Sequence, residues 1–365
     1  MTNPAAAPRN GPALIEVDAL TTFTSALLQA AGMEAEKADI VAEVIVEGDL
    51  IGHHTHGVSM VPTYLSDLRD GRMTGRGDIE IIHRHGACAT WDGKRLPGHW
   101  LIRRALEEAC AFVAEHGVAT VAIFNSQHTG ALAAYLRRVT EHGLVGIVQS
   151  SNPAGSRMAP FGGTVPLFTP NPLAAGFPTH GDPVIIDISA SITTTTMTQT
   201  LARRGERFPE AWALTADGHP TDDPQEVVHR GGSLLPLGGN LKGHKGYGLA
   251  IIVEMLTQGL SGFGRADRPT GTAQSIFVQV IDPEAFGGRD NFLRQSTFMA
   301  EACRATPPGP GVTQVRVPGD SAAGHRRAAL SKGVPVSAEV LAGLVTWAEE
   351  LGVQSIDEPN RRPPA

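Results

Sequence analysis

The sequence has 365 residues, of which 41% are hydrophobic and 18% are charged, and its 30 basic and 37 acidic side chains give a net charge of -7. This length is too great for a small scaffold and favours one large α/β domain or two unequal domains, while the apolar content excludes a disordered chain. The charges are spread along the chain and leave no basic face for a phosphate backbone, so we expect no nucleic-acid partner.

The cysteines and the first residues indicate the compartment. Cys88, Cys110 and Cys303 lie far apart and form no CxxC pair, which favours a reducing cytosol. The start of the chain lacks the basic residues and apolar run of a secretion signal, and no stretch of about 18 apolar residues occurs. We therefore expect a cytoplasmic protein with a short flexible leader and no membrane partner.

The first part of the chain is predicted to be helical. Within residues 33–49, apolar side chains recur at i, i+1, i+4 and i+5 from Ile40 among acidic neighbours, as in an amphipathic helix. A second helix is predicted over residues 21–31. Together they form a helical N-terminal lobe.

From residue 79 onward, the pattern alternates between helices and strands. The predicted elements are a helix at 101–113, strands at 118–124, 144–149 and 183–188, a helix at 247–260 with a stripe of Leu249, Ile252, Leu256 and Leu260, and a strand at 276–281. Two of these strands have no polar face, which is typical of a sheet covered by helices on both sides. This segment therefore predicts an α/β core.

The chain is predicted to end in one more helix. After a connector rich in proline and glycine at 304–311, apolar residues between Val340 and Leu351 share one face, and Ser337 is placed to cap the helix. That face needs a partner, and the N-terminal lobe is the simplest one. We therefore expect both chain ends to form one small helical domain beside a larger α/β domain.

Three imidazoles crowd into residues 52–57, at His53, His54 and His56. A histidine held in a cleft exchanges protons near neutral pH, and the hydroxyl of Thr55 can orient it. Two alternatives stay open: a capping or solvated role, and a metal site built from the HxH pairs at 54–56 and 83–85.

Two other polar clusters are placed to bind a ligand. Residues 125–131, NSQHTGA, directly follow a predicted buried strand, where ligands collect in α/β sheets, although a lone histidine at a strand end, such as His128, is more often structural. Residues 243–248, GHKGYG, open a helix. Their amides and Lys245 suit a phosphate, and an ordinary glycine-rich turn is the alternative.

Asp187 ends a predicted strand, where a carboxylate suits a ribose hydroxyl, although capping of the next segment explains it equally well. The chain contains neither GxxxxGK[ST] nor GxGxxG. None of these features alone identifies a cofactor.

Several long segments, taken in chain order, point to one enzyme family. They are DLIGHHTHGVSMVPTYL, NSQHTGALAAY, APFGGTVPLFTPNPLAAGFP, VIIDISAS, LARRGERFPEAWALTADGHPTDDP, LLPLGG, GHKGYGLA and RVPGDSA, between residues 39 and 333. In these segments the chain resembles the malate/L-lactate dehydrogenase family. That family also contains ureidoglycolate and sulfolactate dehydrogenases, diketogulonate reductase, piperideine-2-carboxylate reductase and a hydroxycarboxylate dehydrogenase.

The resemblance implies a two-domain fold and a cofactor. The expected helical domain is residues 1–78 completed by 322–365, and the expected α/β domain, residues 79–321, binds NAD or NADP without the common Rossmann fingerprint. The family also implies a homodimer with the active site between the domains, and reversible hydride transfer to 2-oxo acids or related imines.

The resemblance also implies roles for single residues. His56 stands at the general acid/base, with Thr55 in place of the usual serine, and His128 stands at a second catalytic histidine beside the cofactor. Substrate contacts are expected at Tyr64 and Met60, and Arg157 is a further candidate from its position. The implied cofactor-binding residues are Thr129, Gly130, Ala131, Leu132, Ser150, Asp187, Ile188, Ser189, His244, Lys245, Gly246, Gly319, Asp320 and Ser321; no metal is implied.

Two positions depart from the family pattern. Many members carry an arginine that can grip a substrate carboxylate where this chain has Met60, and a lysine or aspartate where it has Met197. The loss of a fixed cation favours a substrate bulkier or less charged than malate, and Met197 weakens the imine interpretation.

We therefore expect an NAD(P)-dependent oxidoreductase acting on a small 2-hydroxy acid. The alternatives are a reductase of a cyclic imine or another pathway-specific carbonyl, a relative that only binds the nucleotide, and, from another class, a metal-dependent hydrolase that uses the HxH pairs.

Overall fold

The computed structural model describes residues 12–356 and 361–362, so the expected leader lies outside the described residues. The α-helices are α1 (Val17–Ala30), α2 (Ala35–Leu50), α3 (Val61–Arg69), α4 (Gly98–His116), α5 (Leu136–Glu141), α6 (Thr195–Arg204), α7 (Pro224–His229), α8 (Gly239–Lys242), α9 (His244–Glu254), α10 (Arg289–Ala305), α11 (Asp320–Lys332) and α12 (Ala338–Leu351). The β-strands are β1 (Ala13–Ile15), β2 (Glu80–His85), β3 (Cys88–Asp92), β4 (Val118–Ser126), β5 (Val145–Ser151), β6 (Pro172–Phe177), β7 (Val184–Ser189), β8 (Ala213–Leu214), β9 (Pro220–Thr221), β10 (Ser233–Leu234), β11 (Gln274–Ile281), β12 (Val334–Val336) and β13 (Arg361–Arg362).

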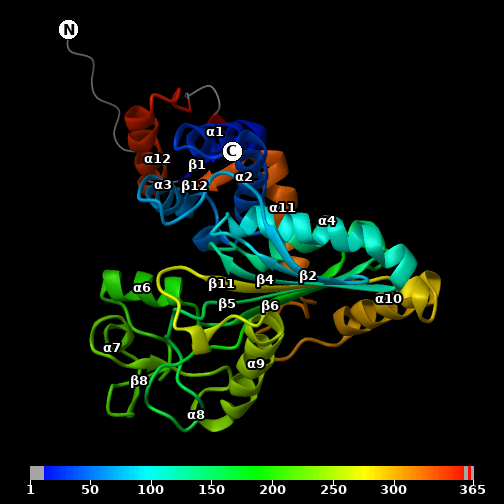
Figure 1. Ribbon diagram of the computed structural model, residues 1–365. Helices are drawn as coiled ribbons and strands as arrows, with labels where there is room; N and C mark the ends of the chain where they lie inside the picture. The colour runs from blue at the N-terminus through cyan, green and yellow to red at the C-terminus, as the bar shows by residue number, and fades with distance from the viewer. Residues whose placement is uncertain (1–11, 357–360, 363–365) are drawn as a thin grey trace.

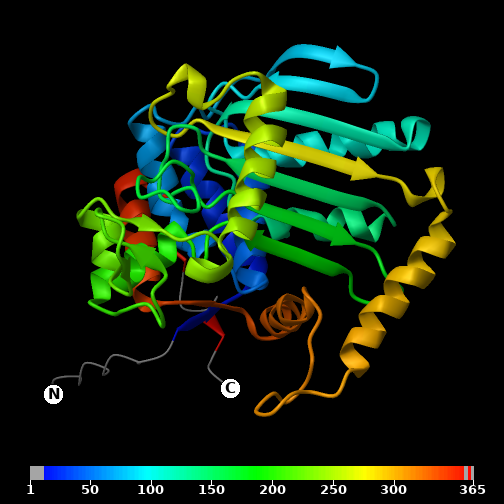
Figure 2. The same cartoon turned by 90° about the horizontal axis from the view of Figure 1, so that it is seen from below.

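A mixed seven-stranded sheet forms the centre of the molecule (Figure 1). Its order is β2-β3-β4-β11-β5-β6-β7, in which β3 and β4 run parallel and the other neighbours antiparallel. Helix α4 packs against β4 and β11 on one face, and α9 approaches β5 from the other, with α10 running past the strand ends (Figure 2). The apolar strands are thus covered on both sides, which confirms the predicted α/β core.

The two chain ends share one hydrophobic core. Strand β1 pairs antiparallel with β12, and α1 and α3 contact α12. Leu20, Leu27 and Leu344 are fully buried in this cluster. The hydroxyl of Ser337 accepts a hydrogen bond from the amide of Val340 at 3.2 Å, which confirms the predicted cap. The domain boundaries at residues 78 and 321 stay a prediction.

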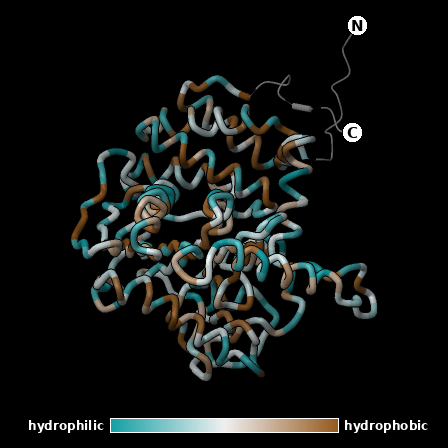
Figure 3. The backbone as a smooth tube through the Cα atoms, turned by 90° about the vertical axis from the view of Figure 1, so that its right-hand side faces the viewer, coloured by the Kyte–Doolittle hydropathy of each residue, from teal (hydrophilic) through white to brown (hydrophobic). Residues whose placement is uncertain are grey.

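A third core cluster fills the space below the large sheet. It includes Met158, Phe168, Leu234 and Ala250, next to the small antiparallel sheet β10-β8-β9. With the clusters of the large sheet and of the two chain ends, this makes three core clusters among the described residues, and hydrophobic stretches, brown in Figure 3, run through the molecule. Among the helices of the described ranges, none is long and apolar enough to cross a bilayer.

The helix predicted at 247–260 buries a different face from the predicted one. Helix α9 begins earlier and continues as a π-helical turn, Met255–Gly259. Ile252 and Leu260 are about half exposed, whereas Glu254 and Thr257 are buried. The prediction of the buried face was wrong because hydropathy does not detect polar side chains that are buried with hydrogen-bond partners.

Candidate active site

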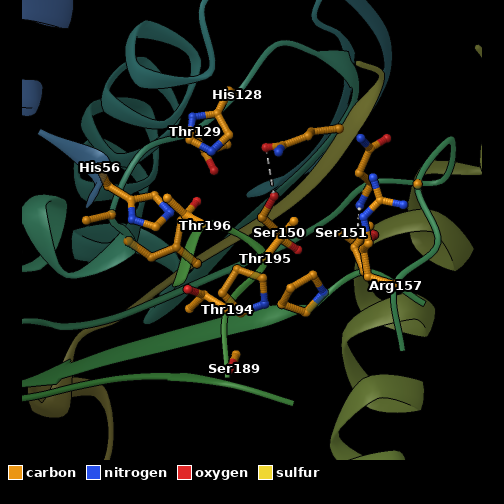
Figure 4. Close-up of a pocket in the computed structure, with 18 of the residues that line it drawn as sticks. His56, His128, Thr129, Ser150, Ser151, Arg157, Ser189, Thr194, Thr195 and Thr196 are labelled. Atoms are coloured by element: carbon orange, nitrogen blue, oxygen red, sulfur yellow. Dashed lines mark hydrogen bonds between the residues drawn. The ribbon is translucent and has the colours of Figure 1, made fainter. Parts of the chain in front are cut away.

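A cavity of about 740 Å³ lies where the helical part of the chain meets the ends of several strands (Figure 4). This volume is within the usual range for a small-molecule site. Its walls come from the loop after α2, the loops after β4 and β5, the end of β7 and the start of α6. The lining residues are His53, His56, His128, Thr129, Gly130, Ala131, Leu132, Ser150, Ser151, Asn152, Ala154, Gly155, Ser156, Arg157, Thr169, Pro170, Pro172, Asp187, Ile188, Ser189, Ile192, Thr193, Thr194, Thr195, Thr196, Met197 and Gln274.

The buried carboxylate of Asp49 organises the histidine-rich loop. It accepts hydrogen bonds from Nδ1 of His54 at 2.9 Å and from the amide of Val58 at 2.7 Å. A Cβ atom at position 57 would lie 2.2 Å from this carboxylate, so the loop requires Gly57 there. The hydrogen bond to Asp49 raises the pKa of His54 and ties this side chain to the end of α2.

His56 points into the cavity from this loop (Figure 4). Its Nδ1 lies 3.0 Å from the hydroxyl of Thr55, which does not line the cavity itself. Burial, reinforced by the nearby His53, lowers the pKa of His56 to about 4. The imidazole is therefore neutral near pH 7 and is ready to accept a proton.

His128 faces His56 across the cavity. The two rings stack with their centroids 5.7 Å apart and an interplanar angle of 18°. Nδ1 of His128 lies 2.6 Å from the hydroxyl of Tyr64 and 3.3 Å from the amide nitrogen of Gly130. Burial, together with His56 and His99, holds the pKa of His128 well below its usual range.

Tyr64 and Met60 do not line the cavity. Tyr64 is 1% exposed and lies behind His128, and Met60 packs against the helical core. Tyr64 therefore reaches the cavity only through the imidazole to which it is hydrogen-bonded.

The opposite wall carries a cation and a helix start. Arg157 lines the cavity, and its guanidinium makes one hydrogen bond to the carbonyl of Ser156 at 3.1 Å. Helix α6 begins at the cavity, and its cap, Thr194, accepts from the amide of Met197 at 3.1 Å. The amides of Thr195 and Thr196 at this helix start attract negative charge.

Asp187 lies near the end of β7 and links this strand to the segment that follows β4. Its carboxylate accepts a hydrogen bond from the amide of Ala133 at 2.8 Å. Burial raises the pKa of Asp187, and the nearby His53 and the amides of Leu132 and Ala133 oppose this rise. The carboxylate thus caps another segment while it also borders the cavity.

Two groups of predicted cofactor residues lie outside the cavity. His244 and Lys245 are exposed at the start of α9, and Gly246 is packed so closely that a Cβ atom there would lie 2.3 Å from the amide nitrogen of Leu237. Gly319, Asp320 and Ser321 lie at the start of α11. Gly319 sits against the beginning of β7, Asp320 forms an ion pair with Arg304, and Ser321 accepts from Arg316 at 2.9 Å.

The family follows from the sequence as a whole. A family model described as malate/L-lactate dehydrogenase matches residues 15–345. The chain belongs to this family. The predicted resemblance is confirmed.

The alignments with known relatives in this family extend over most of the chain. L-sulfolactate dehydrogenase of Methanothermobacter thermautotrophicus is 31% identical over 335 residues, 90% of this chain and 94% of that protein. (2R)-3-sulfolactate dehydrogenase (NADP(+)) of Chromohalobacter salexigens is 33% identical over 300 residues, 79% of this chain and 86% of that protein. The structure of malate dehydrogenase from Pyrococcus horikoshii OT3 matches with a TM-score of 0.85 and 28% identity, covering 97% of this chain and all of that one.

Sequence reasoning missed several residues of the cavity in this family member. His53 was named only as part of a cluster, and the start of α6, residues 193–196, was noted only for its departure at Met197. Ser151, the last residue of β5, and Asn152, which follows it, were not singled out. The available signal was the run of four threonines, residues 193–196, soon after strand β7.

The HxH pairs do not form a metal site in this family member. His83 and His85 lie exposed on β2, and His54 is bonded to Asp49. Within residues 12–356, no group of three or more histidine, cysteine or acidic side chains is placed to hold a metal ion. With the family established, nothing supports the alternative of a metal-dependent hydrolase.

Proposed function

We propose that this protein is an NAD(P)-dependent oxidoreductase that interconverts a small 2-hydroxy acid and its 2-oxo acid, with His56 as the general acid/base. One observation carries the proposal: His56 and His128 face each other, with ring centroids 5.7 Å apart, in a cavity that Arg157 and the start of α6 also line. Membership of the malate/L-lactate dehydrogenase family supports this activity.

The lining of the cavity suits a dinucleotide. Ten serine and threonine residues line it: Thr129, Ser150, Ser151, Ser156, Thr169, Ser189, Thr193, Thr194, Thr195 and Thr196. Hydroxyl groups bind ribose oxygens, and the helix start of α6 offers positive charge to phosphate. The reduced nicotinamide supplies the hydride. The name of the Chromohalobacter relative supports NADP, and NAD is the alternative.

His56 exchanges the proton of the reacting oxygen. In its neutral form Nε2 can accept the proton of a 2-hydroxy acid as the hydride leaves the carbon. Thr55 accepts from, or donates to, the other ring nitrogen and so orients the ring. In the reverse direction the protonated imidazole returns this proton to the oxygen.

Arg157 holds the substrate carboxylate in this proposal. It is the arginine that lines the cavity among the described residues, and its guanidinium can bind a carboxylate through two parallel hydrogen bonds. Met60 is turned into the helical core, and Met197 lines the cavity with an apolar side chain. Met197 therefore favours a substrate bulkier or less charged than malate.

We further propose a cytoplasmic homodimer. The three cysteines are unpaired, and Cys88 and Cys303 are exposed, which suits a reducing compartment. Sedimentation of the purified chain measures the oligomeric state directly.

A panel of 2-oxo acids, assayed with NADH and with NADPH, tests the activity. Pyruvate, oxaloacetate, a branched acid and an aryl acid cover the expected range, and a cyclic imine carboxylate covers the alternative. We expect oxidation of the cofactor with at least one 2-oxo acid, and faster turnover of the larger acids than of oxaloacetate. Turnover of the imine alone would replace the proposal, and equal turnover of oxaloacetate and the aryl acid would remove the substrate preference.

A further inference from the structure

Two imidazoles facing one cavity pose the question of which one carries the proton. We propose that His128 is held as a neutral imidazole with its proton on Nε2, that it donates this hydrogen bond to the reacting oxygen, and that His56 alone exchanges the proton. Tyr64 and the amide of Gly130 are the groups that fix His128 in this state. The inference rests on the proposed function and assigns a different role to each of the two histidines of that site.

The first argument is the hydrogen bond from Gly130. Its amide nitrogen lies 3.3 Å from Nδ1 of His128 with the geometry of a donor. A backbone N–H donates and never accepts, so Nδ1 must offer a lone pair. In a neutral imidazole the proton is then on Nε2.

Tyr64 strengthens the same assignment. Its hydroxyl lies 2.6 Å from Nδ1 of His128, and the side chain is 1% exposed. Burial, with a smaller effect of Asp67, raises the pKa of Tyr64, so the hydroxyl keeps its proton and donates it. Nδ1 thus receives two donors and has no room for a proton of its own.

The surroundings of His128 also disfavour an imidazolium. The ring of His99 lies 6.4 Å from that of His128 and the ring of His56 lies 5.7 Å away, while Tyr64 closes the inner side. These neighbours carry no negative charge that could stabilise a cation, and two of them would repel it if protonated. His128 therefore remains neutral and acts as a donor.

The free nitrogen is directed at the reaction. His128 lines the cavity, and its Nε2 has no protein partner within the described part of the chain. His56 lines the same cavity, and its ring centroid is 5.7 Å from that of His128, so both imidazoles border the space in which the substrate oxygen would bind. A fixed neutral donor at this point stabilises the charge that develops on the oxygen, as an oxyanion hole does.

The tautomer is measured directly by NMR of the full chain with isotope-labelled histidine. We expect Nδ1 of His128 to have the shift of an unprotonated ring nitrogen and Nε2 that of a protonated one, unchanged from about pH 6 to about pH 8. The signals are identified by their loss in His128→Gln and by their displacement in Tyr64→Phe. A proton on Nδ1, or titration of His128 within this range, would overturn the proposal.

Amide substitutions separate a donor from a proton carrier. A glutamine side chain offers an N–H donor but takes up no proton, so His128→Gln should be at least about tenfold faster than His128→Ala, with the pH profile of the wild type. His56→Gln should be as slow as His56→Ala. Equal activity of His128→Gln and His128→Ala, with rescue at position 56 instead, would reverse the two roles.

A further test compares the removal of the hydroxyl group from two different tyrosines. Tyr64→Phe removes only the hydroxyl, and we expect kcat to fall about tenfold with little change in the KM of the cofactor. Tyr247→Phe, which changes a tyrosine packed in the third core cluster, should leave both unchanged. If the protein turned over no 2-oxo acid, the proposed function would fail, while the NMR measurement would still decide the tautomer.

Discussion

Arg265 and Glu254 form an ion pair in which Nε and Nη2 of the guanidinium donate to the two carboxylate oxygens, each at 2.9 Å. The same guanidinium donates to the carbonyl of Gly155 at 2.7 Å. Glu254 also accepts from the side chain of Asn171. This pair therefore anchors, from behind, the loop that carries Arg157 into the cavity.

Replacing Glu254 by Gln should weaken both the fold and substrate binding. The change leaves Arg265 short of a counter-charge in a buried place, which costs about 3 kcal/mol of the free energy of unfolding. Because the loop then loses its anchor, the KM of the 2-oxo acid should rise more than kcat falls. Denaturant unfolding and steady-state kinetics measure the two effects. Arg84→Met, which breaks the partly exposed pair with Glu108, is the control and should cost less than about 1 kcal/mol.

His56→Ala should lower kcat by about two to four orders of magnitude, because the general acid/base is lost. Thermal unfolding should stay close to that of the wild type, since the side chain lines a cavity. His83→Ala, an exposed histidine on β2, serves as the control and should keep full activity. A reduction of kcat by less than tenfold in His56→Ala would exclude this histidine as the proton carrier.

The pH dependence of kcat/KM should differ between the two directions of the reaction. Oxidation needs neutral His56, whose pKa in the free protein is about 4, so its rate should be constant at neutral pH and fall as the pH drops through 4. Reduction needs the protonated form and should slow tenfold for each pH unit above this pKa. Initial rates at low substrate concentration, in both directions, measure the profiles. Opposite slopes would contradict the role of His56.

Arg157→Met should raise the KM of the 2-oxo acid by about a hundredfold, because a charge-assisted pair with the carboxylate is lost. Arg157→Lys keeps the charge but not the two parallel donors and should recover only part of this loss. The Kd of the reduced cofactor, followed by its fluorescence, should change little in either variant. A loss of cofactor binding instead would place Arg157 at the phosphates.

His99 should make the protein sensitive to acid. Its ring is fully buried, and burial lowers its pKa to about 3. The unfolded chain binds a proton near pH 6.5 and the folded chain does not, so the stability falls as the pH drops below 6.5, by about 1 kcal/mol for each pH unit. His99→Leu should remove this part of the slope. Denaturant unfolding of both proteins from about pH 8 to about pH 4 measures it, and parallel curves would contradict the expectation.

Strong local patterns made much of the fold predictable. Helix α2 was found because its apolar residues repeat with a helical period, and strands β4, β5 and β11 were found because they are short apolar runs rich in β-branched residues. Strand β6 begins with Pro172 and consists largely of small residues, so it has little β-propensity of its own and is stabilised by its neighbours in the sheet. Helix α10 buries only Ala300 and therefore shows no apolar stripe.

The site was predictable where a segment of sequence carries it. His56, His128 and Ser150 line one cavity, in agreement with their family motifs. The roles of Tyr64 and Arg265 depend on contacts with residues 64 and 110 positions away, which no local spacing reveals. Such long-range hydrogen bonds become visible only when the chain is folded.

The shared core of the two chain ends also sets the order in which the protein can mature. A ribosome releases α1, α2 and α3 well before α12, the helix that contacts α1 and α3 in this core. Until α12 has been made, the nascent chain therefore exposes an apolar face of these helices. Such a face is a binding site for chaperones. Any premature stop before α12 leaves that face permanently open and marks the truncated product for proteolysis.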